Sequence, residues 1–172
     1  MKVMGDQAGS VIQVAQSSDH PNLNVTLVGT GNTLVIEEGC VVFGAIHLAN
    51  GASVHIGKQV KCSGALALMC HEGSSVEIGS NCLFSQNVQF RPSDAHSVFD
   101  LQTNKRINPP KPIKVGSGVW IGQEVLFLKG AEVADGCVVG ARSMINKVFK
   151  EGSCIIAGSP AKIIRRQIKW AP

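Results

Sequence analysis

One stretch of the chain gathers side chains that can do acid–base chemistry. Residues 91–114 hold Asp94, His96 and Asp100 close together, along with four prolines that stiffen the segment. An imidazole is mostly a free base near neutral pH, so it can accept a proton from an attacking hydroxyl. A carboxylate or a backbone carbonyl on the other ring nitrogen would fix its tautomer. Asp94 and Asp100 are both candidates for that second role.

A six-residue repeat surrounds this segment. From Val115 to Lys150 the chain divides into blocks of six, each opening with an apolar residue, and the same register recurs upstream in three sets of three blocks. Such recurrence is not expected by chance in a chain that is 44% hydrophobic. The openers are Ile36, Val42, Leu48, Ile56, Cys62, Leu68, Ile78, Phe84, Phe90, Val115, Ile121, Phe127, Val133, Val139 and Ile145.

The grouping of the sixes in threes predicts an all-β fold. Successive sets begin 20, 22, 37 and 18 residues apart, so one coil takes 18 residues plus corner insertions. Each six would form a short strand and a turn with its opener inward, and three sixes would close one coil of a triangular prism. We therefore expect a parallel β-helix of about five coils, with residues 91–114 leaving it as a protruding loop. A long loop on a rigid scaffold is either functional or disordered.

The two ends fit the repeat less well. We assign residues 1–160 to the β-helix domain, within which residues 1–35 would form an N-terminal cap or an irregular first coil. After Gly158-Ser159-Pro160 the run is compatible with a helix, because Ile163, Ile164 and Ile168 fall on one side. We expect a short C-terminal α-helix and tail over residues 161–172.

Composition excludes several classes of protein. Only 16% of residues are charged, which argues against disorder. No apolar run is long enough for a transmembrane helix, and the N-terminus lacks a secretory pattern, so a cytoplasmic protein is expected. The six cysteines contain no C-x-x-C pair, and we expect small wall residues rather than disulfides. Residues 146–172 carry six basic side chains and one acid, against a net charge of +4 overall.

These motifs resemble a known family over most of the chain. The sixes, with Val119-Trp-Ile-Gly122 and Ala157-Gly-Ser-Pro-Ala-Lys162, look like the hexapeptide-repeat acyltransferases. The phrase Ser93-Asp-Ala-His-Ser-Val-Phe-Asp100 is similar to the branch that O-acetylates sugars, including capsular polysaccharides. The resemblance implies a left-handed β-helix, a homotrimer, and acetyl-CoA bound between neighbouring prisms.

The resemblance also implies roles for single residues. His96 matches the catalytic base, with Asp94 a weaker candidate as its partner, and Trp120 would lie near the thioester and the acceptor. Asn146 stands where threonine is common, and Arg142 where glycine is usual, so Arg142 would either crowd the cofactor or reach a phosphate. The positions that match cofactor contacts are Gln123, Ala141, Asn146, Lys147, Lys162 and Arg165.

The predicted function is acetyl-CoA-dependent O-acetylation of a sugar hydroxyl by direct attack. Two alternatives stay open: N-acetylation of an amino sugar, and a trimeric β-helix scaffold without enzymatic activity. The remaining histidines show no spacing that would converge on a metal, so no metal is expected. Nucleic-acid binding is disfavoured, because the basic residues are not interleaved with stacking aromatics.

Overall fold

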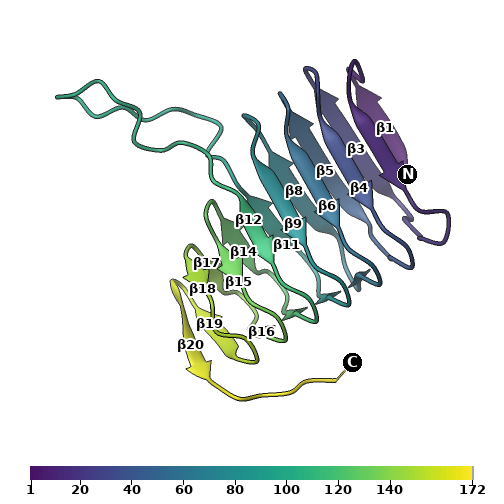
Figure 1. The fold of residues 1–172 in the computed structure, drawn as a ribbon, viewed down its shortest axis with the longest axis vertical. Helices are drawn as coiled ribbons and strands as arrows, with labels where there is room; N and C mark the ends of the chain where they lie inside the picture. The colour runs from purple at the N-terminus through teal and green to yellow at the C-terminus, as the bar shows by residue number, and fades with distance from the viewer. Residues whose placement is uncertain (172) are drawn as a thin grey trace.

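The computed structural model describes residues 1–171 and shows a solenoid of strands wound around three faces (Figure 1). All strand pairs within the coils are parallel. The first sheet has seven strands, in the order given. They are β1 (Lys2–Gly5), β3 (Leu23–Val28), β5 (Gly44–Ala49), β8 (Leu66–Cys70), β11 (Val88–Arg91), β14 (Leu126–Leu128) and β17 (Met144–Ile145).

The second sheet follows the first around each turn, and the third sheet completes the prism. The seven strands of the second sheet are β2 (Val11–Val14), β4 (Thr33–Ile36), β6 (Ser53–Ile56), β9 (Ser75–Ile78), β12 (Ile113–Val115), β15 (Glu132–Val133) and β18 (Val148–Phe149). The six strands of the third sheet are β7 (Lys61–Cys62), β10 (Leu83–Phe84), β13 (Trp120–Ile121), β16 (Val138–Val139), β19 (Ile155–Gly158) and β20 (Ala161–Arg165).

The inward openers form one continuous core, as the repeat predicts. All fifteen opening side chains are buried. Phe84, Phe90 and Phe127 lie in its middle, with ring centroids 6.0 Å apart for the first pair and 4.8 Å for the second. Because β10, β11 and β14 carry these rings, the largest side chains of the core lie on the strands next to the inserted loop.

The expected number of coils is wrong, since the solenoid has about seven turns rather than five. Residues 2–36 form regular strands β1 to β4, which pair in register with the following turns. In β3 the inward residues Leu23, Val25 and Leu27 alternate with outward ones along six residues. Because this strand alternates with a period of two, its residues do not show the six-residue register from which the number of coils is predicted. The first turns are therefore not counted.

The expected C-terminal helix is also wrong. Residues 161–165 form β20, which pairs antiparallel with β19, and no helix occurs among residues 1–171. Ala161 is buried, Lys162 exposed and Ile163 half-buried, a period of two rather than 3.6. The edge of the third sheet offers unpaired backbone groups, and a strand rich in β-branched residues satisfies them where a helix would not. Consequently no described helix is long and apolar enough to span a membrane.

The cysteines line the wall, as predicted. All six are free and buried. Burial raises the pKa of Cys62 and of Cys70 to about 12, and that of Cys82 to about 11. A thiol in such an apolar setting stays protonated and acts as a small hydrophobic residue.

Candidate active site

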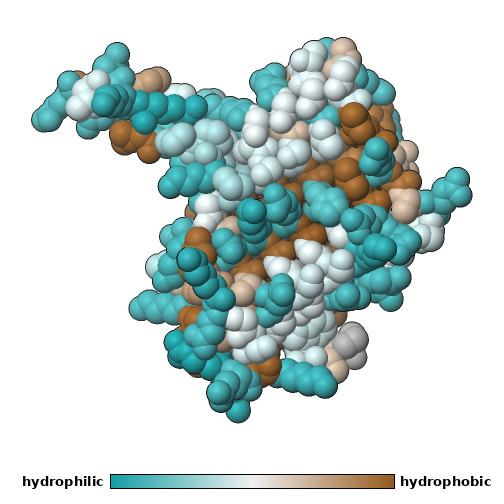
Figure 2. Space-filling view, in the orientation of Figure 1, coloured by the Kyte–Doolittle hydropathy of each residue, from teal (hydrophilic) through white to brown (hydrophobic). Residues whose placement is uncertain are grey.

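The inserted loop, residues 92–112, leaves the solenoid where the first sheet turns into the second (Figure 1). Its outer part, residues 98–107, doubles back on itself and is called the arm below. A bridge between Phe99 and Arg106 holds the two halves, together with backbone bonds of 2.9 Å from Asp100 to Lys105 and from Ile107 to Val98. Figure 2 shows the arm standing clear of the body, with hydrophilic side chains over most of it.

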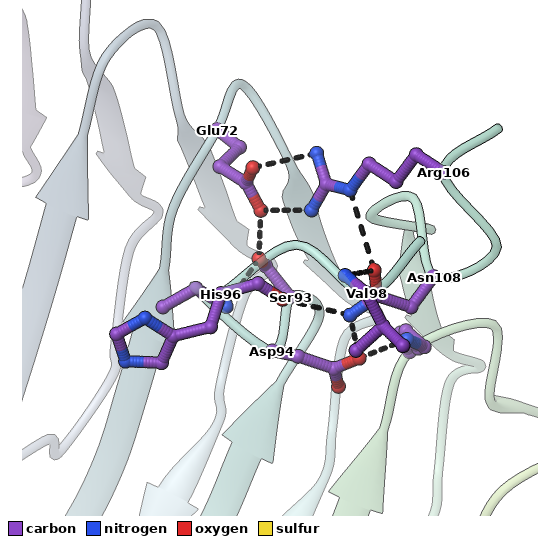
Figure 3. A network of polar contacts seen from close by, with 9 residues as sticks. Glu72, Ser93, Asp94, His96, Val98, Arg106 and Asn108 are labelled. Atoms are coloured by element: carbon purple, nitrogen blue, oxygen red, sulfur yellow. Dashed lines mark hydrogen bonds and ion pairs between the residues drawn. The ribbon is translucent and has the colours of Figure 1, made fainter. Parts of the chain in front are cut away.

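An ion pair fastens the arm to the solenoid (Figure 3). Arg106 donates two hydrogen bonds to the carboxylate of Glu72, at 2.8 and 3.0 Å. Glu72 lies at the corner that follows β8, one coil before the loop, and it also accepts a bond from the hydroxyl of Ser93. The guanidinium, helped by this hydroxyl, lowers the pKa of Glu72 to about 2. The pair is bidentate, so it fixes direction as well as distance.

Asn108 connects the arm to the segment that carries His96 (Figure 3). Its side-chain amide donates to Oδ2 of Asp94 and to the backbone carbonyl of His96, both at 2.8 Å. Its side-chain oxygen accepts the backbone N–H of Val98 at 2.6 Å. Asn108 is buried, so its donors and its acceptor are all used within the loop. This arrangement holds the backbone on both sides of His96.

The imidazole of His96 is exposed and points away from this network (Figure 3). Asp94 instead forms an ion pair with Lys129 and accepts the bond from Asn108. The contact with Lys129 lowers the pKa of Asp94 most, and the hydrogen bond from Asn108 lowers it further. Within residues 1–171 no hydrogen bond joins the Asp94 carboxylate to the His96 ring. Asp94 therefore shapes the loop through Lys129 and Asn108 in this structure.

The second candidate carboxylate belongs to the tip of the arm. Asp100 accepts bonds from the backbone and hydroxyl of Thr103, at 2.7 and 2.8 Å, and from the backbone of Gln102 at 3.1 Å. The backbone N–H of Thr103 is the largest cause that lowers the pKa of Asp100. These bonds close the turn at which the arm reverses direction. The Asp100 carboxylate is therefore used in hydrogen bonds within that turn.

Trp120 lies on the outer face of the third sheet and is 40% exposed. Its ring packs against Trp170, with centroids 6.1 Å apart and an interplanar angle of 42°. The loop that carries His96 leaves at the corner between the first and second sheets. In a three-sided prism that corner is opposite the third face. A single chain thus places His96 and Trp120 on opposite sides of the solenoid.

Two of the matched cofactor positions are stacked at the corner between the third and first sheets. Gln123 and Ala141 are both exposed there, and the backbone of Arg142 donates to the Gln123 carbonyl at 2.8 Å, which shows that the turns lie directly one above the other. Arg142 has a φ of 57°, the left-handed conformation that favours glycine. Its side chain forms an ion pair with Glu124, at 2.8 Å between Nε and Oε2.

The other matched positions lie elsewhere on the prism. Asn146 and Lys147 are exposed at the corner between the first and second sheets, where the ammonium of Lys147 lies 5.3 Å from the centroid of the Phe149 ring. Lys162 and Arg165 are exposed on β20, at the end of the third sheet. Neither makes an ion pair within residues 1–171. The chain therefore presents the matched residues in three separate places.

No metal centre forms in the described part of the chain, where no three metal-ligating side chains gather. His55 pairs with Glu37 at 2.9 Å on the second sheet. His47 and His71 stack with ring centroids 4.9 Å apart on the first sheet and its corner. Burial lowers the pKa of His71 most, and the neighbouring His47 lowers it further.

The residues that hold the loop in place are not predicted by any pattern in the sequence. Glu72, Arg106 and Asn108 belong to no repeat, and Glu72 lies in a corner insertion whose only trace is the 22-residue step between coils. Arg106 lies 34 residues from Glu72, and Asn108 lies 10 to 14 residues from its partners in the His96 segment. No pattern among neighbouring residues predicts hydrogen bonds between residues so far apart in the sequence.

Comparison with known proteins places the chain in a family, although no family model matches it. A polysialic acid O-acetyltransferase of Escherichia coli O1:K1 / APEC is 36% identical over 136 residues, which are 79% of this chain and 44% of that protein. The chain thus spans less than half of that relative. A polysialic acid O-acetyltransferase of Neisseria meningitidis is 32% identical over 148 residues, 86% of this chain and 68% of that protein.

A solved structure agrees with these relatives. The crystal structure of the polySia specific acetyltransferase NeuO superposes with a TM-score of 0.86 at 30% identity, covering 99% of this chain and 88% of that one. The likeness therefore includes the whole solenoid and the inserted loop, not the repeat alone. The chain belongs to the hexapeptide-repeat β-helix acetyltransferase family.

Proposed function

We propose that this chain is an acetyl-CoA-dependent O-acetyltransferase that acts on a sugar hydroxyl of a polysaccharide. The observation that carries the proposal is an exposed imidazole, His96, on a loop that the Glu72–Arg106 pair fastens to the solenoid and that Asn108 braces from within. The relatives named for polysialic acid O-acetylation support the acceptor class, a capsular polysaccharide. Catalytic groups are commonly carried on loops that a rigid scaffold positions.

His96 would act as the general base. Its ring accepts the proton of the sugar hydroxyl while that oxygen bonds to the acetyl carbon. The carbon–sulfur bond breaks, CoA leaves as a thiolate, and the imidazolium can return the proton to it. When bound, acetyl-CoA supplies the acetyl group as an activated thioester. The thiols of Cys62, Cys70 and Cys82 are buried, and burial raises their pKa values, so they are poor nucleophiles. This favours direct transfer over a covalent cysteine intermediate.

The site would form between two copies of this chain. His96 and Trp120 are on opposite sides of one prism, so a common site needs His96 of one protomer and Trp120 of the partner subunit. The exposed ring of Trp120 supports a contact, because a large aromatic surface is rarely left open to water. The family resemblance supports an assembly of three left-handed prisms, a homotrimer.

The cofactor would lie in the cleft between these prisms. The exposed corner at Gln123 and Ala141, where successive turns are stacked, would offer backbone groups to an extended amide-containing arm. Asn146 and Lys147 lie on another corner of the same prism. One cofactor would contact both corners only if two different protomers supply them. The ammonium of Lys162 and the guanidinium of Arg165 suit the diphosphate and the 3′-phosphate.

The decisive experiment measures thiol release from acetyl-CoA with a panel of acceptors. The panel contains sialic acid oligomers, neutral glucans and amino sugars. We expect transfer to a hydroxyl acceptor, and we expect His96→Ala to lower it about 10²- to 10⁴-fold, because a positioned base contributes that much. His55→Ala is the matched control, since it removes an exposed imidazole from the second sheet.

Two results would overturn the proposal. Transfer by His96→Ala within about threefold of the unmodified protein would remove His96 as the base. Selective transfer to the amine of an amino sugar, with loss of activity in His96→Ala confined to low pH, would replace O-acetylation by N-acetylation.

A further inference from the structure

We infer that a groove beside Trp120 binds an acidic sugar unit of the acceptor. This inference rests on the proposed function and adds to it a place and a charge for the acceptor. The groove has a volume of about 630 Å³ and lies between the third sheet and the C-terminal tail, residues 166–171. The volume is in the range of pockets that take small ligands.

The tail that forms one wall of the groove is fixed to the solenoid. The backbone of Ile168 donates to the Ser153 carbonyl at 2.9 Å. The indole N–H of Trp170 donates to the Gly118 carbonyl at 2.7 Å, which leaves the apolar faces of this ring along the groove. In Figure 1 the tail runs from β20 beneath the third sheet to the C-terminus.

The charged side chains that line the groove are all cationic. Lys61 comes from the third sheet and Lys169 from the tail, and no carboxylate is among the residues that line the groove. A second groove, of about 500 Å³ on the second sheet, is lined by Glu37, Glu77 and other acids. The second groove has four carboxylates against one lysine, Lys114, so the two grooves differ in the sign of their net charge, and the groove beside Trp120 favours an anionic occupant.

The uncharged lining suits a sugar rather than a simple ion. Gln59 and Asn81 supply amide groups that both donate to and accept from hydroxyls. Trp170 and Leu83 supply an apolar surface for the C–H face of a pyranose ring. The two lysines would then bind a carboxylate on that ring, as point charges that tolerate several geometries.

The position of the groove separates the acceptor from the cofactor. Gln123 and Ala141 lie at the corner between the third and first sheets, whereas Gln59 and Asn81 lie at the opposite corner of the third sheet. Trp120 is between these corners, and Trp170 connects it to the groove at 6.1 Å. The acceptor would thus reach Trp120 from the corner of Gln59 and Asn81, and the cofactor from the corner of Gln123.

The test replaces both lysines and measures binding as well as activity. The probe is a sialic acid oligomer of defined length, with a neutral glucan of matched length as comparison. In the full chain Lys61→Gln/Lys169→Gln should raise KM for the sialic acid oligomer at least tenfold and leave KM for acetyl-CoA within twofold. Calorimetry without acetyl-CoA should show the same loss of affinity for the oligomer.

A double variant with the same change in charge is the control. Lys2→Gln/Lys114→Gln removes two exposed lysines from the first and second sheets and should bind the oligomer normally. All these lysines are exposed, so both double variants should keep the melting temperature of the unmodified protein.

Each contrary result has a distinct meaning. If KM for acetyl-CoA rises instead, the groove belongs to the cofactor and the inference is wrong. It is also wrong if the lysine variant binds the oligomer unchanged, or if the unmodified protein prefers the neutral glucan while still acetylating it. Oligomer binding that depends on Lys61 and Lys169, without transfer to any acceptor, would support the groove and contradict the proposed function.

Discussion

The solenoid wall and the inserted loop are held together by different forces. The wall repeats one solution, an inward apolar residue every six positions, and its stability comes from burial along a continuous core. The loop, residues 92–112, has few buried apolar side chains and is held by single polar contacts, chiefly those of Glu72, Arg106 and Asn108. The comparison teaches that the stability of the wall is spread over many equivalent buried residues, whereas each contact in the loop is unique.

This difference separates stability from activity. A substitution in the wall should lower the free energy of unfolding and affect catalysis only through loss of folded protein. A substitution in the loop should alter the placement of His96 while the seven turns of the solenoid remain intact. Three predictions test that separation, beginning with the largest effect.

The largest effect is expected in the wall. Phe127→Ala removes a fully buried ring that stacks on Phe90 at 4.8 Å, and it should lower the free energy of unfolding by about 3–5 kcal/mol. Urea denaturation followed by circular dichroism measures this. Phe99→Ala is the matched control, because the same ring on the arm is 53% exposed and its loss should cost less than about 1 kcal/mol. Equal losses for the two variants would show that the arm is packed as tightly as the wall.

A smaller effect, on catalysis, is expected at the base of the arm. Asn108→Ala removes the bonds to Asp94, the His96 carbonyl and Val98, so kcat should fall about 10- to 100-fold while KM for acetyl-CoA is unchanged. Asn108→Asp keeps an acceptor for the Val98 N–H but loses both donors, and it should be equally impaired. Steady-state kinetics measure both.

The control for Asn108 is Gln102→Ala, which removes an exposed amide from the arm tip, where Gln102 bonds Asp100 through its backbone. A kcat for Asn108→Ala equal to that of the unmodified protein would show that the amide does not position His96.

The smallest effect is a pH-dependent change in melting temperature. Arg106 and Ser93 depress the pKa of Glu72 from 4.5 to about 2. A carboxyl whose pKa is lower in the folded state stabilises the fold above its unfolded pKa, and that stabilisation is lost as pH falls toward the folded value. Glu72→Gln should therefore melt about 2 °C lower than the unmodified protein above pH ~5, a difference that vanishes near pH ~2.

Scanning calorimetry from neutral to acidic pH checks this. The control is Glu77→Gln, whose carboxylate forms a half-exposed pair with Lys114 at 3.3 Å and should show no such difference. A gap between Glu72→Gln and the unmodified protein that widened as pH fell would contradict the assigned direction of the pKa.

The cases in which the sequence misled share one cause. The run from Ala161 to Trp170 has an apolar side in a helical projection, yet the open edge of β19 takes it as a strand. Leu23, Val25 and Leu27 follow strand alternation, which lies outside the six-residue register. In both regions the conformation follows from pairing with a neighbouring turn, which neither the helical projection nor the six-residue register represents.

The sequence by itself determined the three-sided solenoid, the inward side chains of its wall, the place of the inserted loop and the family resemblance. These features depend on apolar residues that recur at fixed short intervals, and burial converts such a period directly into geometry. Only the tertiary structure decided that Asn108, Glu72 and Arg106 hold the His96 segment, that His96 and Trp120 are on opposite sides of one prism, and that a cationic groove adjoins Trp120. Those relations join residues from different coils and corners through directional contacts, and no interval in the sequence encodes them.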